Sequence, residues 1–209
     1  MSRIGDKVKK AYFNNGTEII PIKGATLTEY PSEYILTELS NQATKVFVQE
    51  FYLKAFFPYD SVLVDGDYLR TVYNNETYLI MNLNDQTFRN NVVQQQGTLY
   101  KSNNTARVLR QRKVLNETTY TEELVWDDIY QINIPCTTTN TRFGAEVSDY
   151  NNIGEVLLDA LLVYVSRHYD IREFDRMEFG TGEVLMVENV DKYNFGYAYE
   201  LRMTQDNRE

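Results

Sequence analysis

The stretch DSVLVDGDYLRTVYNNETYLIM, residues 60–81, decides the fold class of this chain. Its first apolar run, Ser61–Val64, leads into an Asp-Gly-Asp turn. Two segments rich in β-forming residues then flank Asn74-Asn75, which predicts a hairpin of the strands Leu69–Val72 and Thr77–Met81. The stretch therefore predicts short antiparallel strands joined by tight polar turns.

Other strands extend this pattern in both directions. Ile19–Ile22, Lys45–Leu53 and Gln94–Lys101 are rich in β-branched and aromatic residues. Strands about every ten residues, joined by polar turns, are typical of a small antiparallel β-barrel or β-sandwich. The sequence leaves the choice between barrel and sandwich open.

An amphipathic helix precedes the strands. Ile4, Val8 and Tyr12 recur at four-residue steps within Arg3–Phe13, and Asn14-Asn15-Gly16 is a good C-cap sequence. The favoured interpretation is a helix that covers one end of a core, and the alternative is a docking helix.

The second half of the chain repeats the order of the first. The prolines of Ile19-Ile20-Pro21 and Ile132–Pro135 are 114 residues apart, and Asp60 and Asp175 are 115 apart. We therefore predict two related small antiparallel β modules, residues 1–113 with the N-terminal helix and residues 114–209. Because few residues are identical, convergent strand and turn patterning is the alternative.

Two segments resist assignment from pattern alone. Ile153–Ser166 is apolar enough for a buried helix or a buried strand, and the repeat favours a strand over Leu161–Tyr169. Asn140–Ile153 is a long polar loop, a kind of segment that is often functional or mobile. The chain then ends in an alternating strand from Tyr197 to Met203 and a polar tail, Thr204–Glu209, that is expected to fray.

Composition excludes several classes of protein. A single cysteine, Cys136, excludes an internal disulfide framework, and one histidine, His168, removes most catalytic scaffolds. No apolar run approaches the roughly 20 residues that span a bilayer. Met1–Lys10 has lysines but no apolar segment or cleavage site behind them, so we expect no signal peptide and a chain that stays where it is made.

Charge divides the two halves. Residues 1–113 carry 14 Lys and Arg against 11 Asp and Glu, a net +3, whereas residues 114–209 carry 7 against 19, a net −12. A protein that binds nucleic acid needs a net cationic face. Because the second half is strongly anionic, we expect it to repel DNA. The two halves are expected to face different surroundings.

No catalytic, metal or cofactor site emerges from the residue pattern. His168 and Cys136 favour structural roles, because sequence adjacency brings no nucleophile and orienting partner together. Asp127-Asp128 lacks the repeated spacing of a calcium loop, so a solvated acidic face is favoured. Phosphate loops, dinucleotide fingerprints and serine elbows are absent from the sequence. We therefore expect a protein that is not an enzyme and binds no cofactor or metal.

Two segments are candidates for interaction. The basic cluster Arg107, Arg110, Arg112 and Lys113 lies at the module boundary and suits a docking arm for an acidic partner, including a neighbouring copy; a basic linker without a partner is the alternative. The loop Asn140–Ile153 is a candidate channel or partner loop through the residues Arg142, Phe143, Asp149 and Tyr150.

The strand and turn units resemble those of tailed-phage head-closure proteins. Asp60–Gly66 followed by Glu76–Met81 looks like their strand–turn–strand unit, and Gln96–Asn104 is similar to the strand that follows it. Asp175–Phe179 with Glu183–Glu188 resembles the same unit a second time. The likeness covers about half of the chain, and the doubled module departs from the usual single small barrel.

The resemblance implies a mechanical function in the virion. Head-closure, or stopper, proteins form a ring beneath the portal or its adaptor, retain the packaged DNA and present a platform to the tail. It implies a small antiparallel barrel with channel-lining loops, a homo-oligomeric ring, portal, adaptor and tail partners, and passage of double-stranded DNA without sequence-specific binding. The chain would be made in the host cytoplasm, contact no membrane and lie in the virion neck.

Two other interpretations stay open. A tail-terminator or baseplate hub protein uses related small β modules at another place in the particle. A carbohydrate-binding β-sandwich, from a different class, would need a pocket of aromatic and carboxylate groups around Trp126 and Asp127.

Overall fold

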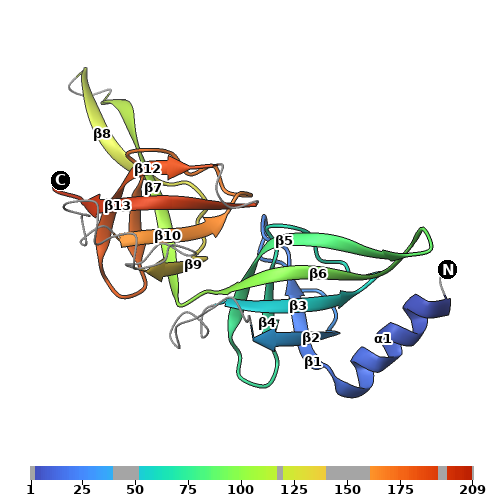
Figure 1. Cartoon of the computed structure of the whole chain (residues 1–209). Coiled ribbons are helices and arrows are strands. Elements are labelled where there is room, and N and C mark those ends of the chain that lie inside the picture. Colours follow the sequence, from blue (N-terminus) through green and yellow to red (C-terminus); the bar gives the residue numbers. More distant parts are fainter. Residues whose placement is uncertain (1–2, 40–51, 117–119, 140–160, 193–196, 209) are drawn as a thin grey trace, which may run out of the picture. The chain divides into compact units, whose positions relative to one another are not determined.

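The computed structural model describes residues 3–39, 52–116, 120–139, 161–192 and 197–208. The protein is mainly β, with 61% of residues in strands and 7% helical. It contains two closed antiparallel barrels of six strands each and one N-terminal helix (Figure 1). The predicted fold class is confirmed, and the open choice between barrel and sandwich is resolved in favour of barrels.

The elements follow one another in simple chain order. The helix is α1 (Arg3–Asn15). The first barrel contains β1 (Thr17–Ile22), β2 (Glu33–Leu39), β3 (Tyr52–Pro58), β4 (Tyr68–Thr71), β5 (Thr77–Phe88) and β6 (Asn91–Lys101). The second half contains β7 (Asn104–Asn116), β8 (Thr121–Asp128), β9 (Ile134–Thr139), β10 (Leu161–Ser166), β11 (Arg176–Phe179), β12 (Val184–Asp191) and β13 (Ala198–Gln205).

The first barrel closes in the order β1-β2-β3-β6-β5-β4, and every neighbouring pair is antiparallel. Pairing of β4 with β1, for example Leu69 with Pro21, completes the ring. Inward-facing side chains then form a buried core of Ile19, Ile35, Ala55, Phe57, Leu63, Leu69, Tyr78, Ile80 and Leu99. Closure leaves this barrel without exposed sheet edges along its paired segments.

The second barrel has the same topology as the first. Its strands run β7-β9-β10-β13-β12-β11, and pairing of β11 with β7 closes the ring. In chain order β7, β9, β10, β11, β12 and β13 therefore take the places of β1 to β6. The additional strand β8 pairs with β7 outside this ring. The repeat predicted from the sequence is present at the level of topology.

The register of the repeat differs from the one that the sequence suggests. Asp67 and Asp175, 108 residues apart, each stand directly before the fourth strand of their barrel, so Asp175 corresponds to Asp67 and not to Asp60. The proline pairing is also wrong, because Pro21 lies in β1 whereas Pro135 lies in β9, which takes the place of β2. The sequence similarity had matched strands that are not equivalent.

The chain forms two compact units whose boundary falls at Asn103, whereas the sequence analysis divides the modules at Lys113, which lies within β7. The first unit contains Met1–Asn103 with Ser166–Tyr169 and Tyr193–Ala198, and the rest forms the second. The segment that the sequence analysis regarded as a basic arm is therefore part of a barrel strand.

The helix α1 follows the predicted span and packs on the first barrel. Tyr12 is buried and its hydroxyl donates to Gln94 Oε1 over 2.5 Å, while Lys9 pairs with Asp60 at 2.6 Å. The helix ends where Gly16 donates its N–H to the carbonyl of Tyr12 over 2.7 Å. These contacts agree with a helix that covers part of a core.

Other local expectations met mixed outcomes. Leu161–Ser166 is a strand, as the repeat favoured.

The prediction of a strand over Ser61–Val64 is wrong. This segment is a loop in which Leu63 is buried while Val62 and Val64 are exposed. The tail is anchored rather than frayed, because the buried Asp206 carboxylate accepts hydrogen bonds from Arg176 and Arg208. Among the described residues no helix is long and apolar enough to cross a membrane.

Candidate functional site

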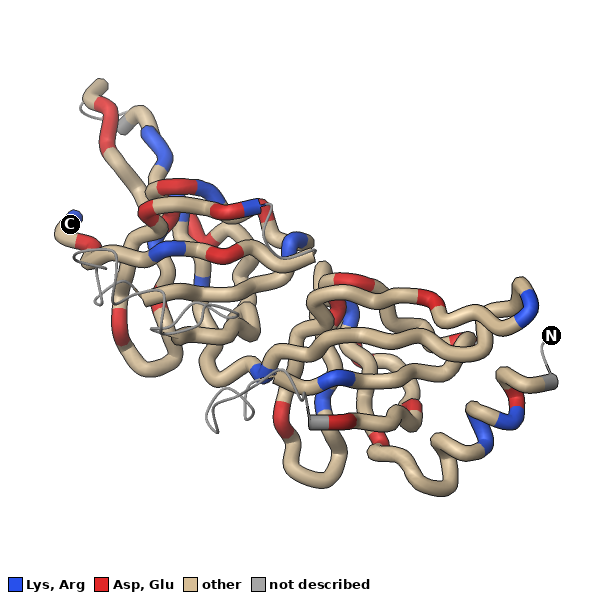
Figure 2. The backbone as a smooth tube through the Cα atoms, viewed as in Figure 1, with Lys and Arg blue, Asp and Glu red and all other residues tan. Residues whose placement is uncertain are grey.

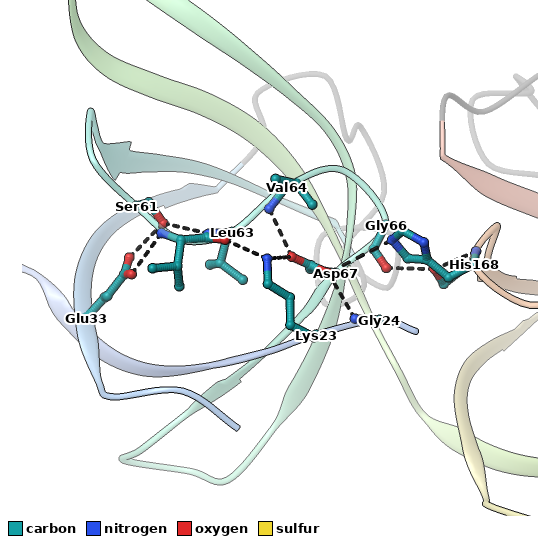
Figure 3. A network of polar contacts seen from close by, with 11 residues as sticks. Lys23, Gly24, Glu33, Ser61, Leu63, Val64, Gly66, Asp67 and His168 are labelled. Carbon is teal, nitrogen blue, oxygen red and sulfur yellow. Dashed lines mark hydrogen bonds and ion pairs between the residues drawn. The ribbon is translucent and has the colours of Figure 1, made fainter. Parts of the chain in front are cut away.

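A network of polar contacts in the first unit surrounds Asp67, in the loop between β3 and β4 (Figure 3). The Asp67 carboxylate is buried, and it accepts hydrogen bonds from the backbone N–H groups of Gly24 (2.9 Å) and Val64 (3.0 Å). Lys23, directly after β1, places its ammonium 2.8 Å from the same carboxylate. A buried carboxylate with two N–H donors and a cation has its charge and its lone pairs compensated.

The backbone fixes this loop as firmly as the side chains do. Gly66 donates to the carbonyl of Ile80 over 2.9 Å, and Ile80 donates to the carbonyl of Asp67 over 2.9 Å. Gly66 has φ of +83°, in the left-handed region that glycine adopts without strain. The Asp67 loop is thereby fastened to β5 on one side and to the start of the 23–24 turn on the other.

The second barrel contains the same loop. Phe174 donates to the carbonyl of Val187 over 2.8 Å, and Val187 donates to the carbonyl of Asp175 over 2.9 Å. The buried Asp175 carboxylate accepts from the N–H of Arg172 (2.8 Å), as Asp67 accepts from Val64. Arg110 on β7 supplies the cation through Nε (2.7 Å) and Nη2 (2.8 Å). Each barrel thus braces its fourth strand with a buried aspartate and a basic residue that lies on or directly after its first strand.

The one important difference lies at the left-handed position. Phe174 has φ of +69°, where the first barrel has Gly66. A phenylalanine in this region is strained, at a cost of about 1–2 kcal/mol. Phe174 is 64% exposed, so little side-chain packing offsets this strain.

The predicted basic cluster is brought together on β7, but every member has an acidic partner in its own unit. Arg107 pairs with Asp128 at 2.8 Å, and Arg110 pairs with Asp175. The remaining two cations pair with β8: Arg112 with Asp127, and Lys113 with Glu122 at 2.8 Å. Docking through these four residues stays a prediction, but Arg110 cannot be varied in its test without also breaking the loop of the second barrel.

The same pairs account for the acidic dipeptide Asp127-Asp128. Burial alone would raise the pKa of the Asp128 carboxyl, but hydrogen bonds from Arg107 and from the N–H of Gln131 hold that pKa below its usual range. Both carboxylates therefore serve as anionic partners of β7. No group of three or more His, Cys, Asp and Glu side chains that could hold a metal ion occurs within the described ranges.

Trp126 is occupied by contacts of its own unit. The guanidinium carbons of Arg176 and Arg208 lie 3.9 Å and 4.9 Å from its ring centroid. Hydrogen bonds from Arg208 and Arg176 outweigh burial and hold the pKa of the Asp206 carboxyl far below its ordinary value. This cluster anchors the end of the chain and places two guanidinium groups against the Trp126 ring.

Cys136 and His168 both lie in structural surroundings. Burial raises the pKa of the Cys136 thiol to about 12, so the thiolate is scarce at neutral pH. His168 Nε2 lies 3.9 Å from Asp67 Oδ1, too far for a hydrogen bond. The hydroxyl of Ser166 donates to the Gly66 carbonyl over 2.7 Å and accepts from the N–H of His168, so it is held as a structural link.

The remaining predicted site residues, Arg142, Phe143, Asp149 and Tyr150, lie outside the described residues, as does the rest of the loop from residue 140 onward. None of the predictions from the sequence indicated the roles of Lys23, Asp67 or the cluster around Asp206. Aspartates directly before the fourth strand in both halves were the available signal for the loops, but matching Asp175 to Asp60 concealed it. Comparison of the chain with protein families, with curated proteins and with solved structures found no match.

Proposed function

We propose that this chain is a structural protein of the neck of a tailed bacteriophage. It forms a ring between the portal or its adaptor and the tail, retains the packaged DNA and provides the platform on which the tail docks. The observation that carries the proposal is the small closed antiparallel barrel of six strands, because the resemblance to head-closure proteins implies a small antiparallel barrel.

The chemistry of the described residues supports a mechanical role. Buried polar groups such as Asp67 and Asp175 have their hydrogen bonds and charges satisfied within the fold. An assembly protein needs such rigid modules rather than a reactive group with a perturbed pKa. Residues 104–209, which include the four cations of β7, carry 11 Lys and Arg against 19 Asp and Glu, and this net −8 would let a DNA duplex pass without sticking, because it repels the phosphate backbone.

Disruption of the gene in the phage that encodes the chain tests this function. We expect heads that package DNA and then lose it, beside complete free tails, when particles are viewed by electron microscopy. Complementation with the wild-type gene should restore infectious particles. Normal heads with overlong or misassembled tails would move the protein to the tail terminator or the baseplate hub, and infectious particles without the gene would overturn a role in the virion.

A sugar-binding function makes a different prediction. It requires that substitution of Trp126 and Asp127 abolish binding to a glycan array without unfolding the second barrel. The arginines over Trp126 and the pairing of Asp127 with Arg112 disfavour it.

A further inference from the structure

The second barrel carries one element that its fold does not require. Strand β7 pairs with β9 and β11 only through Asn104–Leu109. Beyond this segment, in the part of the chain that the structure describes, it pairs only with β8. We call residues 110–116 of β7 and residues 120–127, which include β8 up to Asp127, the ribbon; among the described residues, the first barrel has no strand that corresponds to β8.

The ribbon exposes large apolar side chains. Leu115 is 57% exposed, Leu124 is 59% exposed and Tyr120 is 81% exposed. Leu115 and Leu124 share one face, because Leu115 is opposite Glu122 and side chains two residues apart on a strand point the same way. A two-stranded ribbon is marginally stable by itself in water, and apolar groups gathered on it indicate a surface that becomes covered.

Charge is segregated between the two strands of the ribbon. Strand β7 contributes Arg110, Arg112 and Lys113, whereas β8 contributes Glu122, Glu123 and Asp127; Figure 2 shows the blue and red segments side by side. Arg112 pairs with Asp127 and Lys113 pairs with Glu122 within one ribbon. The two long edges of the ribbon nevertheless belong to strands of opposite charge. Edges of this kind complement each other when two copies lie side by side in the same direction.

We propose that the ribbon is a subunit contact, in which the β7 edge of one copy pairs with the β8 edge of a second copy. Within one ribbon β7 and β8 are antiparallel, so ribbons that point the same way give an up-and-down sheet in which every neighbouring pair is antiparallel. Charge selects this head-to-tail contact, since two β8 edges would place Glu122, Glu123 and Asp127 against their own copies. A head-to-tail contact closes into a ring when the rotation between copies allows it.

This contact deepens the proposed function, because a neck ring needs a repeated head-to-tail interface. It is tested on the purified full-length chain, independently of any particle. One variant carries Lys113→Cys on β7 and a mass tag, and a second carries Leu124→Cys on β8. The native Cys136 is buried with a raised thiol pKa and leaves little background for a short bismaleimide cross-linker.

We expect a cross-linked dimer of the two variants when they are mixed and little from either variant alone. Tyr73→Cys, at an exposed position in the β4–β5 turn of the other unit, is the matched control and should not cross-link to Leu124→Cys. A dimer formed by Leu124→Cys alone would show a symmetric contact, and no mixed dimer at any concentration would show no contact through the ribbon. Either result overturns the proposal.

Substitution gives an independent measurement. Leu115→Lys together with Leu124→Lys should weaken self-association by at least tenfold in analytical ultracentrifugation, with an unchanged far-UV circular dichroism spectrum. Tyr73→Lys should leave self-association unchanged. If the ribbon variant associates like wild type, the ribbon is not the contact. A chain that cross-links head-to-tail, yet whose loss leaves virions intact, would keep this contact and remove the neck function.

Discussion

At the scale of single residues, the protein depends on two buried aspartates in equivalent positions. Asp67 and Asp175 each brace a loop and hold a cation that is distant in sequence, Lys23 directly after β1 and Arg110 on β7. Removal of one charge from such a pair leaves the other without compensation in a partly buried site. The two aspartates are therefore important for the stability of the fold, although no sequence motif marks either of them.

We expect Asp67→Asn to lower the free energy of unfolding by about 2–3 kcal/mol, because Lys23 loses its counter-charge and an amide cannot accept as many hydrogen bonds. Asp175→Asn should have an effect of similar size. Asp60→Asn, which removes an exposed pair with Lys9, should change stability by less than about 1 kcal/mol. Urea unfolding followed by circular dichroism measures the free energy of unfolding of all three variants. Equal losses of stability in Asp60→Asn and Asp67→Asn would contradict the structural role of the Asp67 loop.

The Asp206 carboxyl gives a pH dependence with a definite sign. The pKa of this carboxyl is lowered in the folded chain, so its ionised form stabilises the folded state. This stabilisation is fully present above the ordinary carboxyl pKa of about 4 and is lost as the pH falls below that value. Asp206→Asn should therefore be less stable than wild type at pH 7, and the two stabilities should converge towards about pH 2. Urea titrations across this range test the expectation, and a constant difference would contradict it.

At the scale of elements, neighbouring residues of α1 lie in different environments. Tyr12 is 3% exposed and lies in the core, whereas Phe13 is 65% exposed beside Tyr34, with ring centroids 5.0 Å apart. The four-residue period of Ile4, Val8 and Tyr12 predicts that all three lie on the inner face of the helix, but of these only Tyr12 is buried, since Val8 is half-buried and Ile4 is 43% exposed. The helix is thus an integral cover of the first barrel.

We expect Tyr12→Ala to destabilise the chain by about 3 kcal/mol, through a cavity and the loss of the hydrogen bond to Gln94. Phe13→Ala should cost less than about 1 kcal/mol, because only an edge contact with Tyr34 is lost. Thermal unfolding of the two variants compares them directly. A loss of equal size at both positions would mean that α1 packs differently in solution.

At the scale of the whole molecule, the chain is more than two barrels in succession. The first compact unit includes Ser166–Tyr169, and within it the N–H of Ser166 donates to the Tyr68 hydroxyl over 3.3 Å and its side chain donates to Gly66. A cut at Asn103 therefore separates the first barrel from residues that belong to its own unit. The boundary of a stable fragment cannot be placed by a single position.

We expect a fragment of residues 1–103 to form β structure but to protect the amides of β4 at least tenfold less than the full chain does. The reason is the loss of the Ser166 contacts to Gly66 and Tyr68 beside this strand. Hydrogen exchange followed by mass spectrometry measures the protection of Tyr68–Thr71 in both proteins. Equal protection would show that residues 1–103 are complete as a unit.

The sequence by itself determined what depends on neighbours along the chain. The turn chemistry of residues 72–76 specified the β4–β5 hairpin, the four-residue period specified α1, and the alternation near the end of the chain located β13. The mainly β class followed from the same local patterns, whereas the doubled module was predicted from a register that paired strands that are not equivalent. These signals act over a few residues, so they need no knowledge of distant contacts.

Only the tertiary structure decided what depends on distant pairing. Closure of the barrels requires β1 to meet β4 and β7 to meet β11, and no local pattern encodes these meetings. Lys23 reaches Asp67 across 44 residues and Arg110 reaches Asp175 across 65, so the sequence showed a basic cluster where the fold makes ion pairs. The register of the repeat, in which Asp175 corresponds to Asp67 and not to Asp60, also depends on these distant contacts. Strand and turn patterns recur too often along the chain to fix this register by themselves.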